Sequence, residues 1–250
     1  ALYEEAFQYY DSLWTAQYDT IELIQDKPVT PDLSDEYVSY SSPKFLDENT
    51  ILALREDLDH LDAFVEIDNE GNEKVLHYPG TMTSEQFSFE NHKIVWSERE
   101  PDTRWDNRDY SVIKIYDLYK RETETITENT KLFSPDLSSK NKITAVKLNK
   151  SDSASLVILN AKTGWIEQEF ASPGNHFIQN PVWSADGKSI FAIGLTDQGK
   201  TIYRFDLAKR EWSQLLTATY YDIQDLSATD KYLYFHGTYS GIDNIYAYHF

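Results

Sequence analysis

The same arrangement of residues recurs five times along the chain, and this repetition restricts the folds that the sequence can adopt. In each copy, an extended segment leads through a short polar turn into a strand that begins with a large aliphatic residue. These aliphatic residues recur at intervals of 43 to 49 positions and are Ile51, Ile94, Ile143, Ile190 and Leu233. Repeats of this length are typical of folds in which similar units stack on one another, because a single unit cannot bury its own apolar faces.

Each of the first four copies continues into a second alternating strand that ends in Asp or Asn and is followed by a turn and a further short strand. These strands end at Asp68, Asp117, Asn160 and Asp206, whereas the fifth copy has His249 at this place. Alternation with a period of two, interrupted by turn residues, predicts antiparallel strands joined by hairpins. Four strands in each copy predict an all-β fold, a β-propeller with about five visible blades.

The alternative fold is a β-sandwich of short strands, but a sandwich has no reason to repeat one phrase five times. We therefore expect two regions, an N-terminal region over residues 1–36 and propeller repeats over residues 37–250. The predicted blades span about 37–80, 81–131, 132–174, 175–218 and, incompletely, 219–250.

The N-terminal region differs in pattern from the repeats. Apolar residues at helical spacing over residues 2–17 predict a short amphipathic helix. The alternating segment from Tyr18 to Ile24 predicts a strand, and a Pro- and Asp-rich linker follows it.

The fifth copy stops after its third strand, which leaves two interpretations of the ring. In the favoured one, the chain is a fragment of a larger propeller with at least one more blade after Phe250. In the other, the predicted strand over residues 18–24 completes the last blade and closes a ring of five. An unpaired strand edge also allows pairing with a second copy, which would give a homo-oligomer through this blade.

One phrase in the fourth copy carries a resemblance to a known family. Residues 180–190, Asn-Pro-Val-Trp-Ser-Ala-Asp-Gly-Lys-Ser-Ile, resemble the repeat P-x-W-S-P-D-G-K-x-I of TolB-type (WD40-like, PD40) propellers, which also occurs in prolyl-oligopeptidase-like proteins. Residues 134–138 are a weaker copy, and residues 240–246 resemble the third strand of the same repeats. Ala185 replaces the usual proline, and the first, second and fifth copies lack the Trp-Ser-x-Asp-Gly turn. We interpret Asp186 as a residue that caps this turn.

The resemblance covers roughly residues 37–250 and implies a TolB-like β-propeller from a larger bacterial cell-envelope protein with an extracytoplasmic location. The function that it implies is a non-catalytic binding or scaffold module for a protein, peptide or glycan ligand. The alternative is an accessory gating or substrate-guiding domain of a larger peptidase whose catalytic residues lie outside this chain.

Composition excludes several other classes of function. The chain holds 42 Asp and Glu against 23 Lys and Arg, for a formal net charge of −19, which argues against nucleic-acid partners and anionic membrane surfaces. It has no cysteine, which removes thiolate metal sites and cysteine nucleophiles. Its apolar runs are of strand length, so we expect no direct membrane insertion of this segment, and residues 1–10 lack the pattern of a signal peptide.

No catalytic motif stands out, and we expect neither a catalytic residue nor a cofactor. Ser240 lies between glycines without the G-x-S-x-G spacing, and the six histidines show no metal-binding spacing. The group Asp57, Asp59, His60 and Asp62 has the oxygen ligands that calcium prefers, but a solvated hairpin end is the favoured interpretation, and we predict no metal site.

The most distinctive segment runs from Glu98 to Tyr110 and lengthens a hairpin of the second copy. We predict ligand-binding residues within it, because Trp and Arg are common at interfaces and loops carry function. These candidates are Arg104, Trp105, Asp106, Arg108 and Asp109. The competing interpretation is an internally salt-bridged insertion in which Trp105 packs on its own blade. A third hypothesis, a propeller glycosidase, would use acids such as Glu98 or Asp106.

Overall fold

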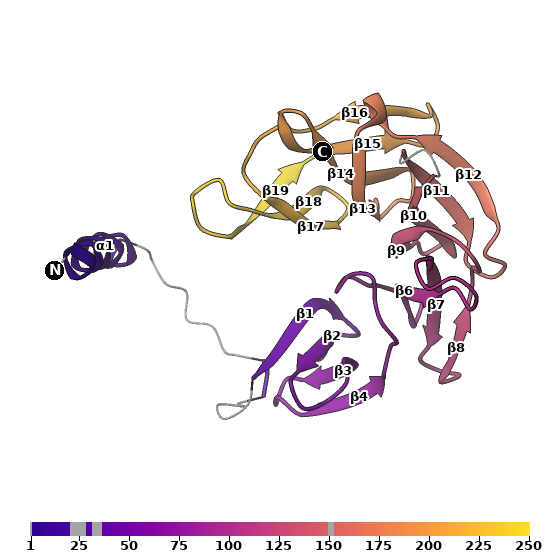
Figure 1. Cartoon of the computed structure of the whole chain (residues 1–250), viewed down its shortest axis with the longest axis horizontal. Helices are drawn as coiled ribbons and strands as arrows, with labels where there is room; N and C mark the ends of the chain where they lie inside the picture. Colours follow the sequence, from indigo (N-terminus) through magenta and orange to yellow (C-terminus); the bar gives the residue numbers. More distant parts are fainter. Residues whose placement is uncertain (1, 21–28, 32–36, 150–152) are drawn as a thin grey trace.

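The predicted β-propeller is confirmed. The computed structural model describes residues 2–20, 29–31, 37–149 and 153–250. These residues form one α-helix, a short 3-10 helix (Pro173–Asn175) and five antiparallel sheets, of which four have four strands and the last has three. Figure 1 shows the sheets following one another around a common centre as the blades of a propeller, with β4, β8, β12 and β16 on the outside.

Every blade is a simple meander in which consecutive strands pair. The strands of the first two blades are β1 (Val38–Phe45), β2 (Thr50–Asp57), β3 (Ala63–Asp68), β4 (Glu73–His77), β5 (Ser88–Glu90), β6 (Lys93–Pro101), β7 (Asp109–Asp117) and β8 (Glu122–Thr125). Those of the other three are β9 (Leu132–Leu137), β10 (Lys142–Leu148), β11 (Ala154–Asn160), β12 (Ile166–Ala171), β13 (Phe177–Trp183), β14 (Ser189–Thr196), β15 (Gly199–Asp206), β16 (Glu211–Gln214), β17 (Ile223–Ala228), β18 (Tyr232–Gly237) and β19 (Asn244–His249).

The five repeated aliphatic residues occupy corresponding places in the five blades. Each lies on the second strand of its blade. On one side it pairs with a residue near the end of the innermost strand, and on the other side with the last apolar residue of the third strand. Ile143 faces Leu137 and Leu159, and Ile190 faces Trp183 and Phe205 in the same way. The register is the same for Ile51, Ile94 and Leu233. The sequence repeat is therefore a structural repeat.

The Asp or Asn at the end of each third strand caps the turn that follows it. The backbone amides of Tyr119 and Lys120 both donate to Asp117 Oδ1 at 3.0 Å, and the equivalent bonds form at Asp68, Asn160 and Asp206. The amide of Lys120 lowers the pKa of Asp117. Asp186 has a similar role, because the Lys188 amide and the Ser184 hydroxyl donate to it and lower its pKa to about 2.

The core consists of apolar layers between neighbouring blades. One layer lies between each pair of adjacent blades, and its residues come from both sheets. The largest fully buried side chain is Trp96, which packs against Phe64 of the first blade with ring centroids 5.3 Å apart. Burying such layers is the main favourable contribution to the stability of a stacked fold.

Helix α1 (Leu2–Tyr18) confirms the predicted N-terminal helix. It stands apart from the blades in Figure 1, and none of its residues is buried. The strand predicted from Tyr18 is wrong at its start, because Tyr18 ends the helix and helical hydrogen bonds continue to Asp19 and Thr20. The rest of that strand, residues 21–24, lies outside the described residues. In the described parts of the chain, no helix has the length and apolarity needed to cross a membrane.

The last blade ends at β19, and no described strand pairs with the outer edge of this strand. Side chains of β18 alternate, so that Leu233 and Phe235 point into the core while Tyr232 and Tyr234 are partly exposed on the opposite face.

Candidate binding sites

The long hairpin between β6 and β7 is organised by Asp102. Its carboxylate accepts hydrogen bonds from the backbone amides of Arg104 (2.9 Å) and Trp105 (3.2 Å) and from the hydroxyl of Tyr110 (2.8 Å). These donors, the Arg104 amide foremost, lower the pKa of Asp102. Asp102 therefore holds the hairpin in shape and presents its neighbours to solvent.

Three of the predicted ligand-binding residues lie at the exposed end of this hairpin. The Arg104 guanidinium lies over the Trp105 ring, 5.1 Å from its centroid, and Asp106 follows in solvent. Trp105 is 55% exposed, which argues against the interpretation that it packs on its own blade. The other part of that interpretation is confirmed, because Arg99 with Asp109 and Arg108 with Asp102 form ion pairs within the hairpin. Whether these residues contact a ligand stays a prediction.

The other two, Arg108 and Asp109, line a groove of about 600 Å³ between the second and third blades. Arg108 lies over the ring of Tyr110 at 5.1 Å, and its Nε is 3.7 Å from Asp102 Oδ2. Asp109 forms an ion pair of 2.6 Å with Arg99. The structure thus separates the five candidates into an exposed end and a groove wall.

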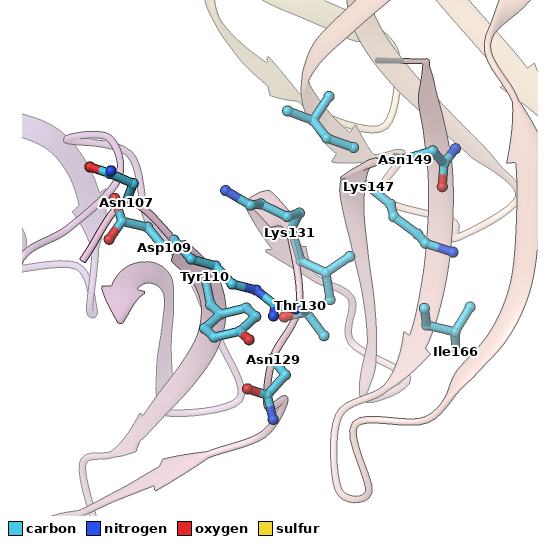
Figure 2. Close-up of a pocket in the computed structure, with 12 residues that line it drawn as sticks. Asn107, Asp109, Tyr110, Asn129, Thr130, Lys131, Lys147, Asn149 and Ile166 are labelled. Carbon is cyan, nitrogen blue, oxygen red and sulfur yellow. The ribbon is translucent and has the colours of Figure 1, made fainter. Parts of the chain in front are cut away.

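The opposite side of the groove comes from residues that sequence reasoning missed. Lys131 belongs to the link between the blades, and Lys147 and Asn149 lie at the end of β10 and just after it (Figure 2). No motif marks these positions, because they meet Arg108 and Asp109 only after the two blades stack. The one signal in the sequence is a basic residue, Lys131, in the segment that links two repeats.

Glu98, considered as a glycosidase acid, is a structural residue. Its side chain is only 10% exposed, and Glu98 Oε2 accepts hydrogen bonds from Trp96 Nε1 and the Gly80 amide, both at 3.0 Å. Lys114 Nζ lies 2.6 Å from Glu98 Oε1. A Cβ at position 80 would overlap this carboxylate, so a side chain there would displace Glu98 from its present position. Neither Glu98 nor Asp106 lines the groove, so these two acids do not form there the converging pair that a glycosidase needs.

The acidic group of the first blade forms a hairpin turn. Asp57 Oδ1 accepts hydrogen bonds from the amides of Asp59 (2.9 Å) and His60 (2.6 Å), and its other oxygen pairs with Arg55 at 2.6 Å. Although burial raises the pKa of Asp57, these donors outweigh it and bring the pKa to about 2. Among the described residues, no group of three or more His, Asp or Glu side chains is placed to hold a metal ion.

A second cavity, of about 470 Å³, lies at the centre of the propeller between the innermost strands. Each blade contributes one polar residue from the same place in its innermost strand or the approach to it. These are Ser42, Gln86, Ser134, Asn180 and Asp225. We call them the channel residues. Sequence reasoning did not identify them.

Four channel residues have a left-handed backbone, which is uncommon for residues other than glycine. Their φ angles are 52° at Ser42, 48° at Ser134, 50° at Asn180 and 51° at Asp225. Each stands in a β-bulge at which the innermost strand loses register with its neighbour. Bulges and left-handed residues are over-represented at functional sites, because they redirect a side chain at some cost in strain.

Hydrogen bonds link channel residues of different blades. Ser134 Oγ donates to Asn180 Oδ1 at 3.1 Å, and Gln86 Nε2 donates to Asp225 Oδ1 at 2.6 Å. The latter bond joins the second blade to the fifth. His236 Nδ1 lies 3.1 Å from the other oxygen of Asp225.

Asp136 lies deeper in the same channel and joins three blades. Its carboxylate accepts hydrogen bonds from Ser88 Oγ of the second blade and the Trp183 amide of the fourth, both at 2.7 Å. Burial raises the pKa of Asp136, while these two donors and the charge of Lys44 oppose the rise. Lys44 lines the channel beside it.

No protein-family model matches the sequence, and no curated protein matches it. Solved structures with the same fold are nevertheless similar. The chain matches a putative TolB from Agrobacterium tumefaciens with a TM-score of 0.61 and 11% identity, covering 86% of this chain and 77% of that one. It matches TolB from Acinetobacter baumannii with a TM-score of 0.59 and 12% identity, covering 81% and 51%. It matches an acylaminoacyl peptidase from Pyrococcus horikoshii with a TM-score of 0.54 and 13% identity, covering 86% of this chain and 39% of the peptidase.

The chain therefore spans about half the length of the Acinetobacter TolB and less of the peptidase. At these identities the likeness concerns the fold alone. The architecture is that of the propellers in TolB and in these peptidases.

Proposed function

We propose that this chain is a non-catalytic propeller module that binds an extended segment of a peptide or protein in its central channel. The observation that carries the proposal is the set of channel residues, one from each blade, of which four stand in strained bulges. Hydroxyl, amide and carboxylate groups in one cavity offer both donors and acceptors, and a peptide backbone needs both. These groups stand on or beside the innermost strands of packed blades, so binding there needs little ordering of loops.

The location proposed with this function is outside the cytoplasm, as part of a larger bacterial cell-envelope protein. The resemblance of residues 180–190 to TolB-type repeats and the match to two TolB structures support it. The excess of acidic side chains favours cationic partners, because charge complementarity raises the rate of association.

The match to the acylaminoacyl peptidase favours a second candidate, a gating domain of a larger peptidase. This candidate requires a catalytic domain in the same polypeptide. The reading frame on both sides of residues 1–250 distinguishes the two, because a hydrolase or metallopeptidase motif there would select the second.

The experiment is selection of displayed random peptides on the chain, followed by calorimetric titration of the selected peptides. We expect the double variant Gln86→Ala and Asp225→Ala to weaken their binding at least tenfold, since it removes the bond that joins two channel residues. Asp197→Ala, in an exposed turn of the fourth blade, is the matched control and should bind normally. Equal binding by the channel variant, or failure to select any peptide, would contradict the proposal.

A further inference from the structure

The groove between the second and third blades differs in charge from the rest of the molecule. Of its lining residues, Arg108, Lys131 and Lys147 are cationic and only Asp109 is anionic. The whole chain, in contrast, carries a formal charge of −19. Asp109 is already paired with Arg99 at 2.6 Å, so it does not cancel the charge of the three lining cations.

The three cations differ in their partners. Lys147 is held by Glu169 at 2.8 Å, and Arg108 lies 3.7 Å from Asp102 while stacking on Tyr110. Lys131 is exposed and has no ion pair with any residue that the structure describes. Figure 2 shows Lys131 between the hairpin side chains Asn107 and Asp109 and those of the third blade. This ammonium group is available to an anionic ligand.

The groove also offers amide groups and an apolar surface. The side chains of Asn107 and Asn129 make no hydrogen bond within the described part of the chain, and the bonds of Asn149 to Ser153 and Ser155 are long, at 3.4 and 3.5 Å. Leu148 and Ile166, the latter 37% exposed, add apolar surface. A primary amide both donates and accepts hydrogen bonds, so it can bind neighbouring hydroxyls of a sugar. An apolar surface can pack against the face of a sugar ring.

We propose that this groove binds an acidic oligosaccharide, with a sugar carboxylate against Lys131 and Arg108 and sugar hydroxyls against the asparagine amides. The volume of about 600 Å³ lies within the range of about 300–1,000 Å³ for pockets that bind small organic ligands. The site lies outside the central channel and does not depend on peptide binding there.

The test is calorimetric titration of the whole chain with tri-galacturonate at low ionic strength, beside maltotriose and tri-glutamate. We expect saturable binding of tri-galacturonate, at least tenfold weaker binding of maltotriose, and loss of affinity as salt is raised. Lys131→Gln should weaken binding about tenfold, because a hydrogen bond to a charged group is lost. Lys209→Gln makes the same change of charge at an exposed turn of the fourth blade and should bind as the unaltered chain does.

Absence of saturable binding overturns the proposal, as does unchanged binding by Lys131→Gln. Tri-glutamate binding as tightly as tri-galacturonate would show that the groove recognises charge without a sugar, and would also overturn it. The thermal midpoint of Lys131→Gln should equal that of the unaltered chain, since this side chain is exposed and has no described ion pair.

Discussion

Single residues show why an acidic side chain in a distinctive segment need not be functional. Glu98 and Asp106 look alike in the sequence, since both belong to a hairpin rich in charge. In the structure, Glu98 is enclosed by Trp96, Gly80 and Lys114, whereas Asp106 is exposed. The difference arises because side chains alternate between the two faces of β6, and Glu98 lies on the face toward the first blade. There the backbone of Gly80 comes close enough to donate a hydrogen bond to it.

Replacing Glu98 by Ala should lower the free energy of unfolding by about 3 kcal/mol, because the buried Trp96 N–H loses its acceptor and Lys114 keeps only the longer ion pair with Glu100, at 3.7 Å. Urea denaturation measures this loss. Asp106→Ala is the control and should change stability by less than about 0.5 kcal/mol. A loss for Glu98→Ala as small as that of the control would show that the carboxylate is not an anchor.

His77 should make stability depend on pH. It stacks on Tyr116 with ring centroids 4.4 Å apart, and burial lowers its pKa from 6.5, with Lys114 acting in the same direction and Glu98 against it. The folded chain therefore binds the proton less readily than the unfolded chain. The free energy of unfolding should fall as pH decreases through 6.5 toward the lower folded pKa.

Urea midpoints at pH 7.5, 6.5 and 5.5 test this effect, with His77→Phe as the comparison because phenylalanine retains the ring stacking. The variant should lose less stability than the unaltered chain over this range. The same loss in both proteins would assign the pH dependence to other groups.

At the scale of elements, the sequence predicted the blades because two local signals recur in each. One is the aliphatic residue of the second strand, and the other is the Asp or Asn that caps the turn after the third. The cap acts within one turn, whereas the aliphatic residue packs between neighbouring blades. Both recur at a fixed place in every copy, so their spacing is visible in the sequence before the contacts between blades are known. The prediction of a strand from Tyr18 failed at its start because short alternating segments carry little information, and there the helix includes Tyr18 and its hydrogen bonds reach Thr20.

Asp117→Ala should destabilise the chain by about 1 kcal/mol, because two turn amides lose their acceptor. Asp117→Asn should cost little, since Asn160 caps the equivalent turn of the third blade with the same geometry. Thermal and urea unfolding of the two variants distinguish these outcomes. Equal losses would mean that the carboxylate charge, and not the cap, stabilises the turn.

At the scale of the whole molecule, the cavities were the part that could not be predicted. Each channel residue is about one repeat away from the next in the sequence. A proline follows Ser42, Ser134 and Asn180, but none follows Gln86 or Asp225, so no shared local pattern marks all five. Likewise, the groove combines a hairpin of one blade with a link and a strand end of the next. Such sites exist only after blades have stacked, so residue types and local spacing do not reveal them.

The central claim is that five blades stack around one channel and bring Gln86 of the second blade against Asp225 of the fifth. Because the chain has no cysteine, the variant Gln86→Cys with Asp225→Cys can be treated with a short bismaleimide and analysed by mass spectrometry. We predict an intramolecular cross-link between these positions, and none in a control that pairs Gln86→Cys with Asp197→Cys. Absence of the first cross-link, or equal yields in both proteins, would contradict the arrangement of blades described here.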